Sequence, residues 1–319
     1  MEDFTLRTYR PGDEVSINRS FNKIFKTRRS LKEWRWKFRP ADDGSRIVVA
    51  VDRDQRVIAH YGALRLRLQI DGQEAVGGEP LDAFCLSEGG ATQRRLFTKT
   101  VKEFYRHYRR ADRFCGLFGF PSLRHYRLGR IVLEYGDPYP FPVLGKDLAG
   151  RKLWRWRPKP ANSFDPLGFD RFWERCSPRY PVCVNRDSAR IKYRYLDCPG
   201  NRYTFLSLSG KEGLKAWCCL RRVKRLVTLV DLLWDGRDQE DLIGLNERIQ
   251  GYAASVGAKS LKMWLSGDEE ADGVFRSLGW SPLEDPDPIV LAVMTINPEL
   301  DFAESFKRLY FTMGDSDLI

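Results

Sequence analysis

The sequence lacks any long hydrophobic run. Nowhere in its 319 residues does it approach the roughly 18 to 20 consecutive apolar residues that a membrane-spanning helix needs. The first residues, MEDFTLRTYR, are acidic where a signal peptide is basic, and no apolar block follows them. These absences predict a protein without a transmembrane segment, and we expect it in the cytoplasm.

Histidine is scarce, and the cysteines are not paired along the sequence. The chain has three histidines, His60, His107 and His125, and its seven cysteines show no CxxC spacing. Zinc sites need His and Cys at such spacings, and an odd number of thiols does not complete a disulfide framework. We therefore expect no metal site, and we expect the cysteines to be reduced structural residues.

Positive charge is in excess, and it is concentrated in the first half. Residues 1–160 hold 33 Lys and Arg against 19 Asp and Glu, a net +14, whereas residues 161–319 hold 21 against 24, a net −3. Any polyanionic partner is therefore expected to bind the first half. The 42% of hydrophobic residues is enough to build two domains of about 150 residues each.

A basic, proline-containing stretch, RKLWRWRPKPANSFDP at 151–166, is interpreted as a linker. On each side of it the hydrophobic pattern predicts the same order of hairpin, strand, helix, strand, helix and strand. We therefore predict an α/β protein with two repeated domains, 1–150 and 167–319, each a mixed, mainly antiparallel sheet flanked by helices. The alternative is one mixed α/β domain with an unrelated tail.

The periodicity also places the individual elements. Ser30 is the expected N-cap of a short helix. In the first part we predict a strand at 4–10, helices at 11–25 and 30–38, a hairpin at 46–70, strands at 79–86, 115–121 and 131–135, and helices at 93–110 and 122–129. In the second part we predict a hairpin at 202–223, strands at 225–235, 260–266 and 287–296, helices at 239–257 and 269–280, and a packed strand or tail at 308–319.

Several short segments resemble one known family in their wording and, above all, in their order. They are LRTYRPGDE, RSLKEWRWKF, LDAFCL followed by RRLFTKTVKEF, GFP after the next strand, and FRSLGW before the last strand. Together they resemble the Gcn5-related N-acetyltransferase (GNAT) superfamily, specifically its tandem two-domain members, over most of the chain. The resemblance implies two GNAT-like domains and transfer of an acyl group from acetyl-CoA, or another acyl-CoA, to an amine.

In that superfamily a loop of pattern Q/R-x-x-G-x-G/A after the fourth strand binds the pyrophosphate of acyl-CoA. Backbone N–H groups and the positive end of the following helix attract the anion. Here the three motif positions fall on Thr92, Arg95 and Phe97, and none fits. Either Arg94 and Arg95 contact phosphate through their side chains, or the loop no longer binds the coenzyme. The implied donor-binding residues are Leu86, Gly89, Gly90, Thr92, Gln93, Arg94, Arg95, Leu96 and Phe97.

The corresponding loop of the second half, DLLWDGRDQEDLIGL, also lacks the motif. It carries acidic residues where a phosphate would lie, and like charges repel an anion there. These residues are Asp235, Asp238, Glu240 and Asp241. If one half binds the donor, we expect it to be the first, with the second shaping the acceptor site or the cleft between the domains.

The chemistry that the resemblance implies needs a base for the amine and an acid for the leaving thiolate. Glu79 and Asp82 flank the fourth strand and are the candidate bases, and Tyr126 on the later helix is the candidate acid. Each also has a structural interpretation, as an ordinary carboxylate at a strand end or as a packed tyrosine.

The helix at 93–110 combines a predicted apolar stripe with a basic face. The basic face is either a solvated surface or an attraction for an anion. That anion would be the 3′-phosphate of the coenzyme, an acidic acyl carrier protein or nucleic acid, of which nucleic acid is the least favoured.

Three functions remain open from the sequence. The first is an N-acyltransferase that acts on an amine of a small molecule, sugar or peptide, with an acyl-CoA or a carrier-protein thioester as donor. The second is a Fem-type transferase that takes an aminoacyl group from transfer RNA, although the long helical hairpin common in that group has no evident counterpart here. The third is a non-catalytic binding protein whose donor loops have both decayed.

Overall fold

The computed structural model describes residues 4–39, 45–86, 90–111, 114–132, 135–148, 164–286, 288–295 and 302–317. The chain divides into two compact units. Unit 1 contains residues 1–68, 74–139 and 289–307, and unit 2 contains residues 69–73, 140–288 and 308–319. Each unit is built from segments that are not contiguous in the sequence.

Unit 1 begins with a strand and two helices, as predicted. They are β1 (Phe4–Thr8), α1 (Asp13–Phe25) and α2 (Leu31–Phe38). Ser30 caps α2, because its hydroxyl accepts a hydrogen bond from the Glu33 N–H at 3.2 Å while the Glu33 carboxylate accepts one from the Ser30 N–H at 2.6 Å. The predicted N-cap is therefore confirmed, and it fixes the connection between α1 and α2.

The sheet of unit 1 is mixed. β1, β2, β3 and β4 follow one another in the sheet, β4 pairs with β5 in parallel, and β5 pairs with β14 antiparallel. The bounds are β2 (Ser45–Asp52), β3 (Val57–Ile70), β4 (Gln73–Cys85), β5 (Gly116–Gly119) and β14 (Val290–Met294). Antiparallel pairs dominate, as expected for the predicted fold class.

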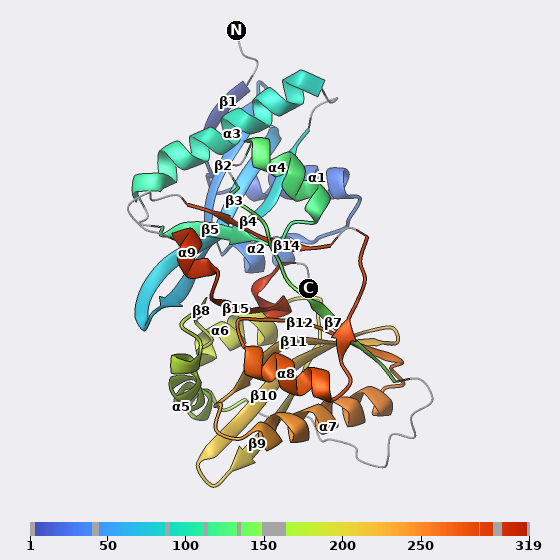
Figure 1. Ribbon diagram of the computed structural model, residues 1–319. Coiled ribbons are helices and arrows are strands. Elements are labelled where there is room, and N and C mark those ends of the chain that lie inside the picture. The colour runs from blue at the N-terminus through green and yellow to red at the C-terminus, as the bar shows by residue number, and fades with distance from the viewer. Residues whose placement is uncertain are drawn as a thin grey trace. The chain divides into compact units, whose positions relative to one another are not determined.

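Helices cover the sheet of unit 1. The long helix α3 (Gly90–Ala111) runs across it (Figure 1), and its Val101 and Phe104 pack against Val48 and Tyr61 in the core. The remaining elements of the unit are α4 (Leu123–Val132), β6 (Tyr139–Pro140) and α9 (Phe302–Phe306). The strand predicted at 131–135 is wrong at its start, because Ile131 and Val132 continue α4.

Unit 2 repeats the arrangement. In unit 2, β11 pairs with β12 in parallel, as β8 does with β15, and α7 and α8 cover one face of its sheet (Figure 1). The strands are β8 (Val182–Val184), β9 (Tyr203–Gly210), β10 (Gly213–Val223), β11 (Leu226–Trp234), β12 (Ser260–Ser266), β13 (Ser281–Pro282) and β15 (Leu309–Thr312). The helices are α5 (Pro166–Cys176), α6 (Ser188–Ile191), α7 (Gln239–Ser255) and α8 (Glu269–Ser277), with a π-helical turn at Lys192–Leu196 and 3₁₀ turns at Ser177–Arg179 and Met313–Asp315.

Two strands are exchanged between the halves of the sequence. β7 (Val143–Asp147) follows α4 in the chain but pairs with β12 of unit 2, whereas β14 follows α8 but pairs with β5 of unit 1. Each sheet thus contains one strand from the other half of the sequence. The predicted boundary at residue 150 and the linker at 151–166 stay predictions, since residues 149–163 lie outside the described part of the chain.

Candidate functional site

The parallel ladder between β4 and β5 of unit 1 is short. Their ladder joins Gly77 with Gly116 and Gly78 with Leu117, and β4 then continues to Cys85. A Cβ atom on Gly78 would collide with the Leu117 side chain, so the absence of a side chain there allows the two strands to approach closely. Further along β4, Asp82 has a φ of 50°, which is left-handed backbone inside a strand. The ladder thus stops well before the carboxyl end of β4, and α3 follows β4 in the chain.

Asp82, one of the two predicted bases, is held by two cations. Its side chain is 2% exposed and forms ion pairs with Arg29 and with Lys37, whose Nζ donates to Oδ1 at 2.8 Å. Burial opposes ionisation, but Lys37 and Arg29 outweigh it and hold the pKa of Asp82 below its ordinary value. A carboxylate held in this way is a weak proton acceptor, so its role as a base stays a prediction.

His60 supports the same residue from β3. Its Nδ1 lies 2.9 Å from the carbonyl oxygen of Asp82, and because a carbonyl only accepts, Nδ1 carries the proton. Burial lowers the pKa of His60 to about 4, so the ring is neutral near pH 7. Nε2 therefore carries a lone pair, and this buried atom has no hydrogen-bond partner. The sequence pattern gave no reason to select His60 for this position.

The other two predicted catalytic residues are both buried. Glu79 lies on β4 and is 4% exposed. Tyr126 on α4 is 3% exposed, stacks on Tyr135 with ring centroids 5.8 Å apart, and donates its hydroxyl hydrogen to the Gly136 carbonyl at 2.7 Å. An acid role for Tyr126 would require its hydroxyl to leave that carbonyl. Both assignments stay predictions.

The predicted donor-binding residues fall into two groups. Leu96 is buried and the half-buried Phe97 packs against the core, whereas Thr92, Arg94 and Arg95 are exposed on the first turns of α3. Leu86 is half-buried, and Gly90, in left-handed backbone with a φ of 75°, begins the helix. Gln93 turns back and donates from Nε2 to the Cys85 carbonyl at 3.2 Å. Gly89 lies outside the described residues.

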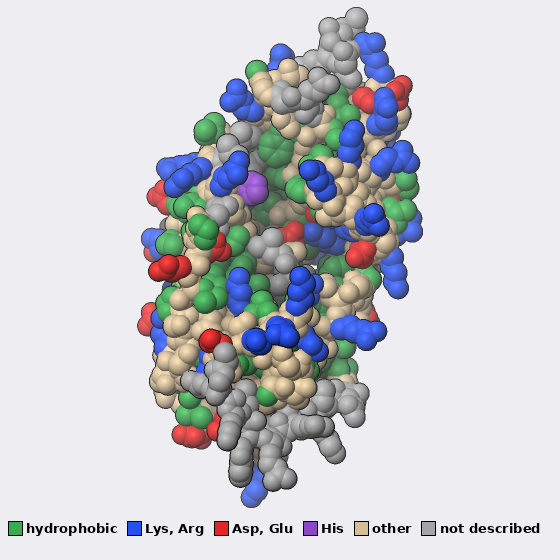
Figure 2. Space-filling model, turned by 90° about the vertical axis from the view of Figure 1, so that its right-hand side faces the viewer, with side chains coloured by type: hydrophobic (Ala, Val, Ile, Leu, Met, Phe, Trp, Pro, Cys, Tyr) green, Lys and Arg blue, Asp and Glu red, His purple; other side chains and the backbone are tan. Residues whose placement is uncertain are grey.

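No acidic residue stands in the first turn of α3. The first four N–H groups of a helix have no partner within the helix, and they carry the positive end of its dipole. Figure 2 shows Lys and Arg side chains spread over the face in view rather than gathered in one patch. Anion binding at the N-terminus of α3 stays a prediction, and the face shown in Figure 2 has no single basic patch.

The equivalent position of unit 2 is closed to an anion. Asp238 caps α7 by accepting from the Glu240 N–H at 3.0 Å, and Glu240 and Asp241 lie in the first turn. Asp241 also accepts from Lys215 Nζ at 3.2 Å. Carboxylates thus occupy the helix N-terminus of unit 2.

In unit 2, the C-terminal segment of the chain lies beside β11 and β12 where their ladder ends. The ladder between β11 and β12 ends at Leu229 and Met263, and Leu265 then pairs with Thr312 of β15. The Thr312 hydroxyl donates to Asp231 Oδ1 of β11 at 2.9 Å, so β15 contacts both strands. In unit 2, β15 therefore occupies the position next to β12 beyond the end of the β11–β12 ladder.

The fold can now be compared with known proteins. No family model and no curated protein sequence matches the chain. Among solved structures, a probable N-acyltransferase of unknown function from Enterococcus faecalis matches with a TM-score of 0.66 at 11% identity, covering 92% of this chain and 72% of that one. Saccharomyces cerevisiae N-myristoyltransferase with bound myristoyl-CoA matches with a TM-score of 0.62 at 10% identity, covering 92% and 83%. A GCN5-related N-acetyltransferase from Anabaena variabilis matches with a TM-score of 0.60 at 10% identity, covering 92% and 73%.

The fold is that of the GNAT superfamily. The resemblance found in the sequence and the predicted fold class are both confirmed at the level of the fold. Within the described residues, no helix is long and apolar enough to cross a membrane, and no group of His, Cys, Asp and Glu side chains is placed to hold a metal ion.

Proposed function

We propose that the protein is an N-acyltransferase that uses unit 1 to bind its donor. The donor is an acyl thioester, either acetyl-CoA or another acyl-CoA. The alternative donor is a carrier-protein thioester, in which a protein carries the same phosphopantetheine arm. The acceptor is an amine. The observation that carries the proposal is that the short parallel ladder of β4 and β5 is combined with a helix α3 that has no acidic residue in its first turn, both in the positions that a GNAT fold uses for its donor.

The chemistry follows from the thioester. The amine nitrogen attacks the carbonyl carbon, the new C–N bond forms, the C–S bond breaks, and the thiolate takes up a proton. We assign the pyrophosphate to the first N–H groups of α3 and to the side chains of Arg94 and Arg95, because a guanidinium matches phosphate geometry. Glu79 and Asp82 are the candidate bases, and Tyr126 is the candidate acid.

Calorimetric titration with acetyl-CoA and with myristoyl-CoA tests the donor site. We expect one molecule to bind per chain, and we expect the double variant Arg94→Glu, Arg95→Glu to weaken binding at least tenfold, because charge-assisted hydrogen bonds to phosphate are lost. Lys102→Glu, about two helical turns further along α3, is the matched control and should change the affinity little.

Two results would redirect the proposal. Unchanged affinity in the double variant would remove the phosphate site from α3. Absence of coenzyme binding, together with binding of aminoacyl transfer RNA that weakens as salt is raised, would favour a transferase that uses transfer RNA as donor.

A further inference from the structure

The segment that contains α1 and α2 carries more positive charge than its own acids can neutralise. Residues 11–39 hold nine Lys and Arg against three Asp and Glu, a net +6 out of the +11 of the whole chain. All three acids already have partners, because Asp13 and Glu14 pair with arginines and the Glu33 carboxylate forms the cap of α2. The excess charge of this segment is therefore left for other groups to neutralise.

Five exposed cations of this segment form no ion pair within the described part of the chain. We call them the α1–α2 basic stripe, and they are Arg19, Lys23, Lys26, Arg28 and Lys32. By contrast, Arg106 on α3 and Arg276 on α8 each pair with an acid one turn away on the same helix. The stripe therefore has no local counter-charge of the kind that these two helices have.

The positive charges of the stripe reinforce one another along α1. Val15, Arg19 and Lys23 are exposed and follow one another at intervals of four residues, so they lie on one face of the helix, and Lys26 is its C-cap. Four residues span about 6 Å of a helix, which is shorter than the Debye length of about 8 Å at physiological ionic strength. Arg19 and Lys23 therefore repel each other, and an anionic partner would relieve that repulsion.

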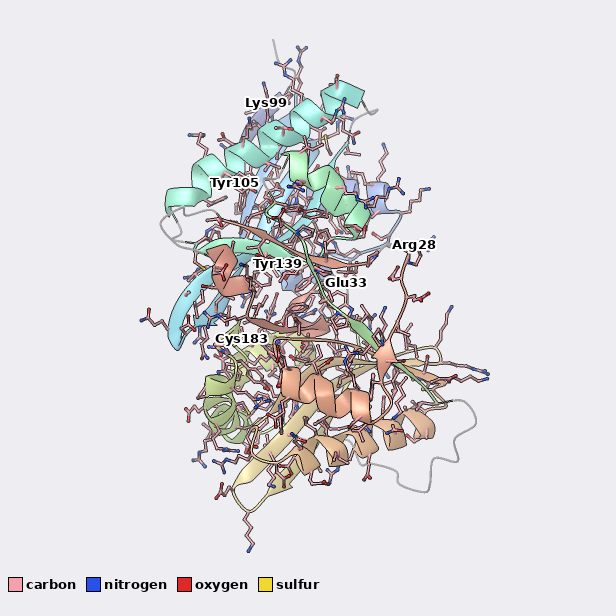
Figure 3. The ribbon with its side chains drawn as sticks, in the orientation of Figure 1. Arg28, Glu33, Lys99, Tyr105, Tyr139 and Cys183 are labelled. Atoms are coloured by element: carbon pink, nitrogen blue, oxygen red, sulfur yellow. The ribbon has the colours of Figure 1, made fainter. Side chains whose placement is uncertain are left out.

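Side-chain hydrogen bonds hold the connection between α1 and α2 in place. Asn22 donates from Nδ2 to the Arg29 carbonyl at 2.9 Å and accepts from the Arg29 N–H at 2.9 Å, while Asn18 donates to the same carbonyl at 2.8 Å. Figure 3 labels Arg28, the exposed residue just before this fixed point, and Glu33 in the cap of α2. The stripe is thus preformed, which lowers the ordering cost of binding a partner.

The same segment is joined to the strand that the proposed function uses for the thioester. Arg29 and Lys37 both pair with Asp82 of β4, and β4 leads into α3. A molecule bound to the stripe therefore lies on the helical segment that contacts β4.

We propose that the α1–α2 basic stripe docks an acidic carrier protein, which delivers the acyl group on its phosphopantetheine arm. The inference rests on the acyl transfer proposed above and selects between its two donors. Free acyl-CoA needs the coenzyme site alone, whereas a carrier also needs a protein surface of opposite charge. An acidic helix with carboxylates four residues apart matches the interval between Arg19 and Lys23. Acyl-CoA, which has the same arm, remains a ligand of the α3 site.

Two other anionic partners fit the segment less well. A membrane surface needs a broad apolar face beside the cations, and the large apolar side chains exposed on this segment are Val15 and Phe25. Nucleic acid binds broad basic patches and stacks bases on free aromatic faces. The cations in Figure 2 are spread out, and Arg29 lies 3.8 Å above the ring of Phe21. A short stripe of cations favours the carrier protein.

The test measures binding of a panel of purified acidic acyl carrier proteins, in the form that carries the arm, to the full chain by calorimetry. We expect at least one carrier to bind, and we expect the double variant Arg19→Glu, Lys23→Glu to weaken that binding about tenfold or more, because attraction becomes repulsion. The matched control is Arg171→Glu, Lys224→Glu, which reverses two exposed cations of unit 2 and changes the net charge equally. It should leave the affinity within about twofold.

Several outcomes would overturn the proposal. They are no binding by any carrier of the panel, equal weakening by the two double variants, or unchanged carrier binding in a folded Arg19→Glu, Lys23→Glu variant. Binding of phosphatidylserine vesicles or of transfer RNA through the stripe, in place of a carrier, would also overturn it. Acyl-CoA binding is measured on the same variants and should not change. Acyl-CoA binding without carrier binding would remove the docking surface and leave the acyltransferase proposal standing, whereas a carrier that docks on the stripe without coenzyme binding or acyl transfer would do the reverse.

Discussion

The two units share a fold, yet they differ in what lies next to their parallel strands and in the first turn of the helix that follows. In unit 1, the parallel ladder of β4 and β5 is short, and the helix after β4 begins without an acidic residue. In unit 2, β15 pairs with β12 beyond the end of the β11 ladder, and carboxylates cap α7. The difference indicates that a repeated scaffold can keep its sheet and helices while the groups around its parallel strands change from one copy to the other.

The largest effect should come from the buried charges, because the buried aspartates Asp82 and Asp231 pair with different cations. Arg186→Met leaves its two ion-pair partners in unit 2, Asp231 and Asp315, buried without a cation, so we expect the free energy of unfolding to fall by about 3–5 kcal/mol. Arg29→Met leaves Lys37 beside Asp82, so we expect a smaller loss of about 1–3 kcal/mol. Guanidinium denaturation of both variants measures the difference. Equal losses of unfolding free energy would mean that the additional carboxylate, Asp315 of the C-terminal segment, does not increase the cost of removing Arg186.

The second prediction uses the different groups that bond each aspartate. His60 bonds Asp82 in unit 1, whereas the Tyr195 hydroxyl donates to Asp231 in unit 2 at 2.7 Å. Burial lowers the pKa of His60 to about 4, so the unfolded chain, with an ordinary value of about 6.5, binds a proton that the folded chain does not. Stability should therefore fall as the pH is lowered from about 6.5 to about 4, with a contribution from His60 of about 2–3 kcal/mol.

Urea denaturation across this pH range checks the contribution of His60. The variant His60→Gln should show a shallower slope than the wild type. Burial raises the pKa of Tyr195 well above its ordinary value, so Tyr195→Phe should keep the wild-type slope in the same range. Parallel pH profiles for wild type and His60→Gln would show that the histidine is not neutral in the folded protein.

The third prediction concerns the C-terminal segment that packs beside β11 and β12 in unit 2. A Cβ atom on Gly314 would collide with the Tyr195 hydroxyl, next to Asp231, so Gly314→Ala should lower the free energy of unfolding by about 1–3 kcal/mol through overpacking. A Cβ atom on Gly273 of α8 meets nothing within 4 Å, so Gly273→Ala should be neutral or stabilise by up to about 1 kcal/mol. Thermal unfolding compares the two. A silent Gly314→Ala would contradict the close approach of the C-terminal turn.

The smallest effect should come from changing the N-terminus of α3 so that it resembles the N-terminus of α7. Thr92→Asp places an acid in the first turn of α3, as in α7, and should weaken acyl-CoA binding about fivefold, or about 1 kcal/mol, through repulsion of the phosphate. Asp238→Ala should leave that affinity unchanged but lower the stability of unit 2 by about 1 kcal/mol through loss of the cap. Calorimetric titration and denaturation read out the two effects, and tighter coenzyme binding by Thr92→Asp would exclude phosphate from the α3 N-terminus.

Local patterns in the sequence predicted much of the fold. The hydrophobic periods placed α3, α7 and the strands next to them, and the Ser30 to Glu33 spacing located the cap of α2. The sequence missed α5, β8 and α6 between 166 and 191, where short elements give too few residues for a period. It also missed the exchanged strands, since the pairing of β7 with β12 joins segments more than a hundred residues apart.

The candidate site was harder to predict than the fold. Asp82 was chosen for its place on the fourth strand, but its partner Arg29 lies 53 residues away in the sequence. The tautomer of His60 depends on a carbonyl 22 residues away. No spacing rule joins such residues, because the sheet and the α1–α2 connection bring them together only in the folded chain. Gly78, which allows β4 and β5 to approach closely, was present in the sequence but had no recognised pattern.

The exchanged strands have a consequence for how the chain acquires its structure. During synthesis, β5 is complete long before residues 290–294 exist, so its edge has no partner until nearly the whole chain has been made. An unpaired edge is a site of aggregation, and contacts between distant residues slow folding. We therefore expect a fragment that ends at residue 150 to be prone to association. We also expect the two halves to fold cooperatively only after the last strands have been synthesised.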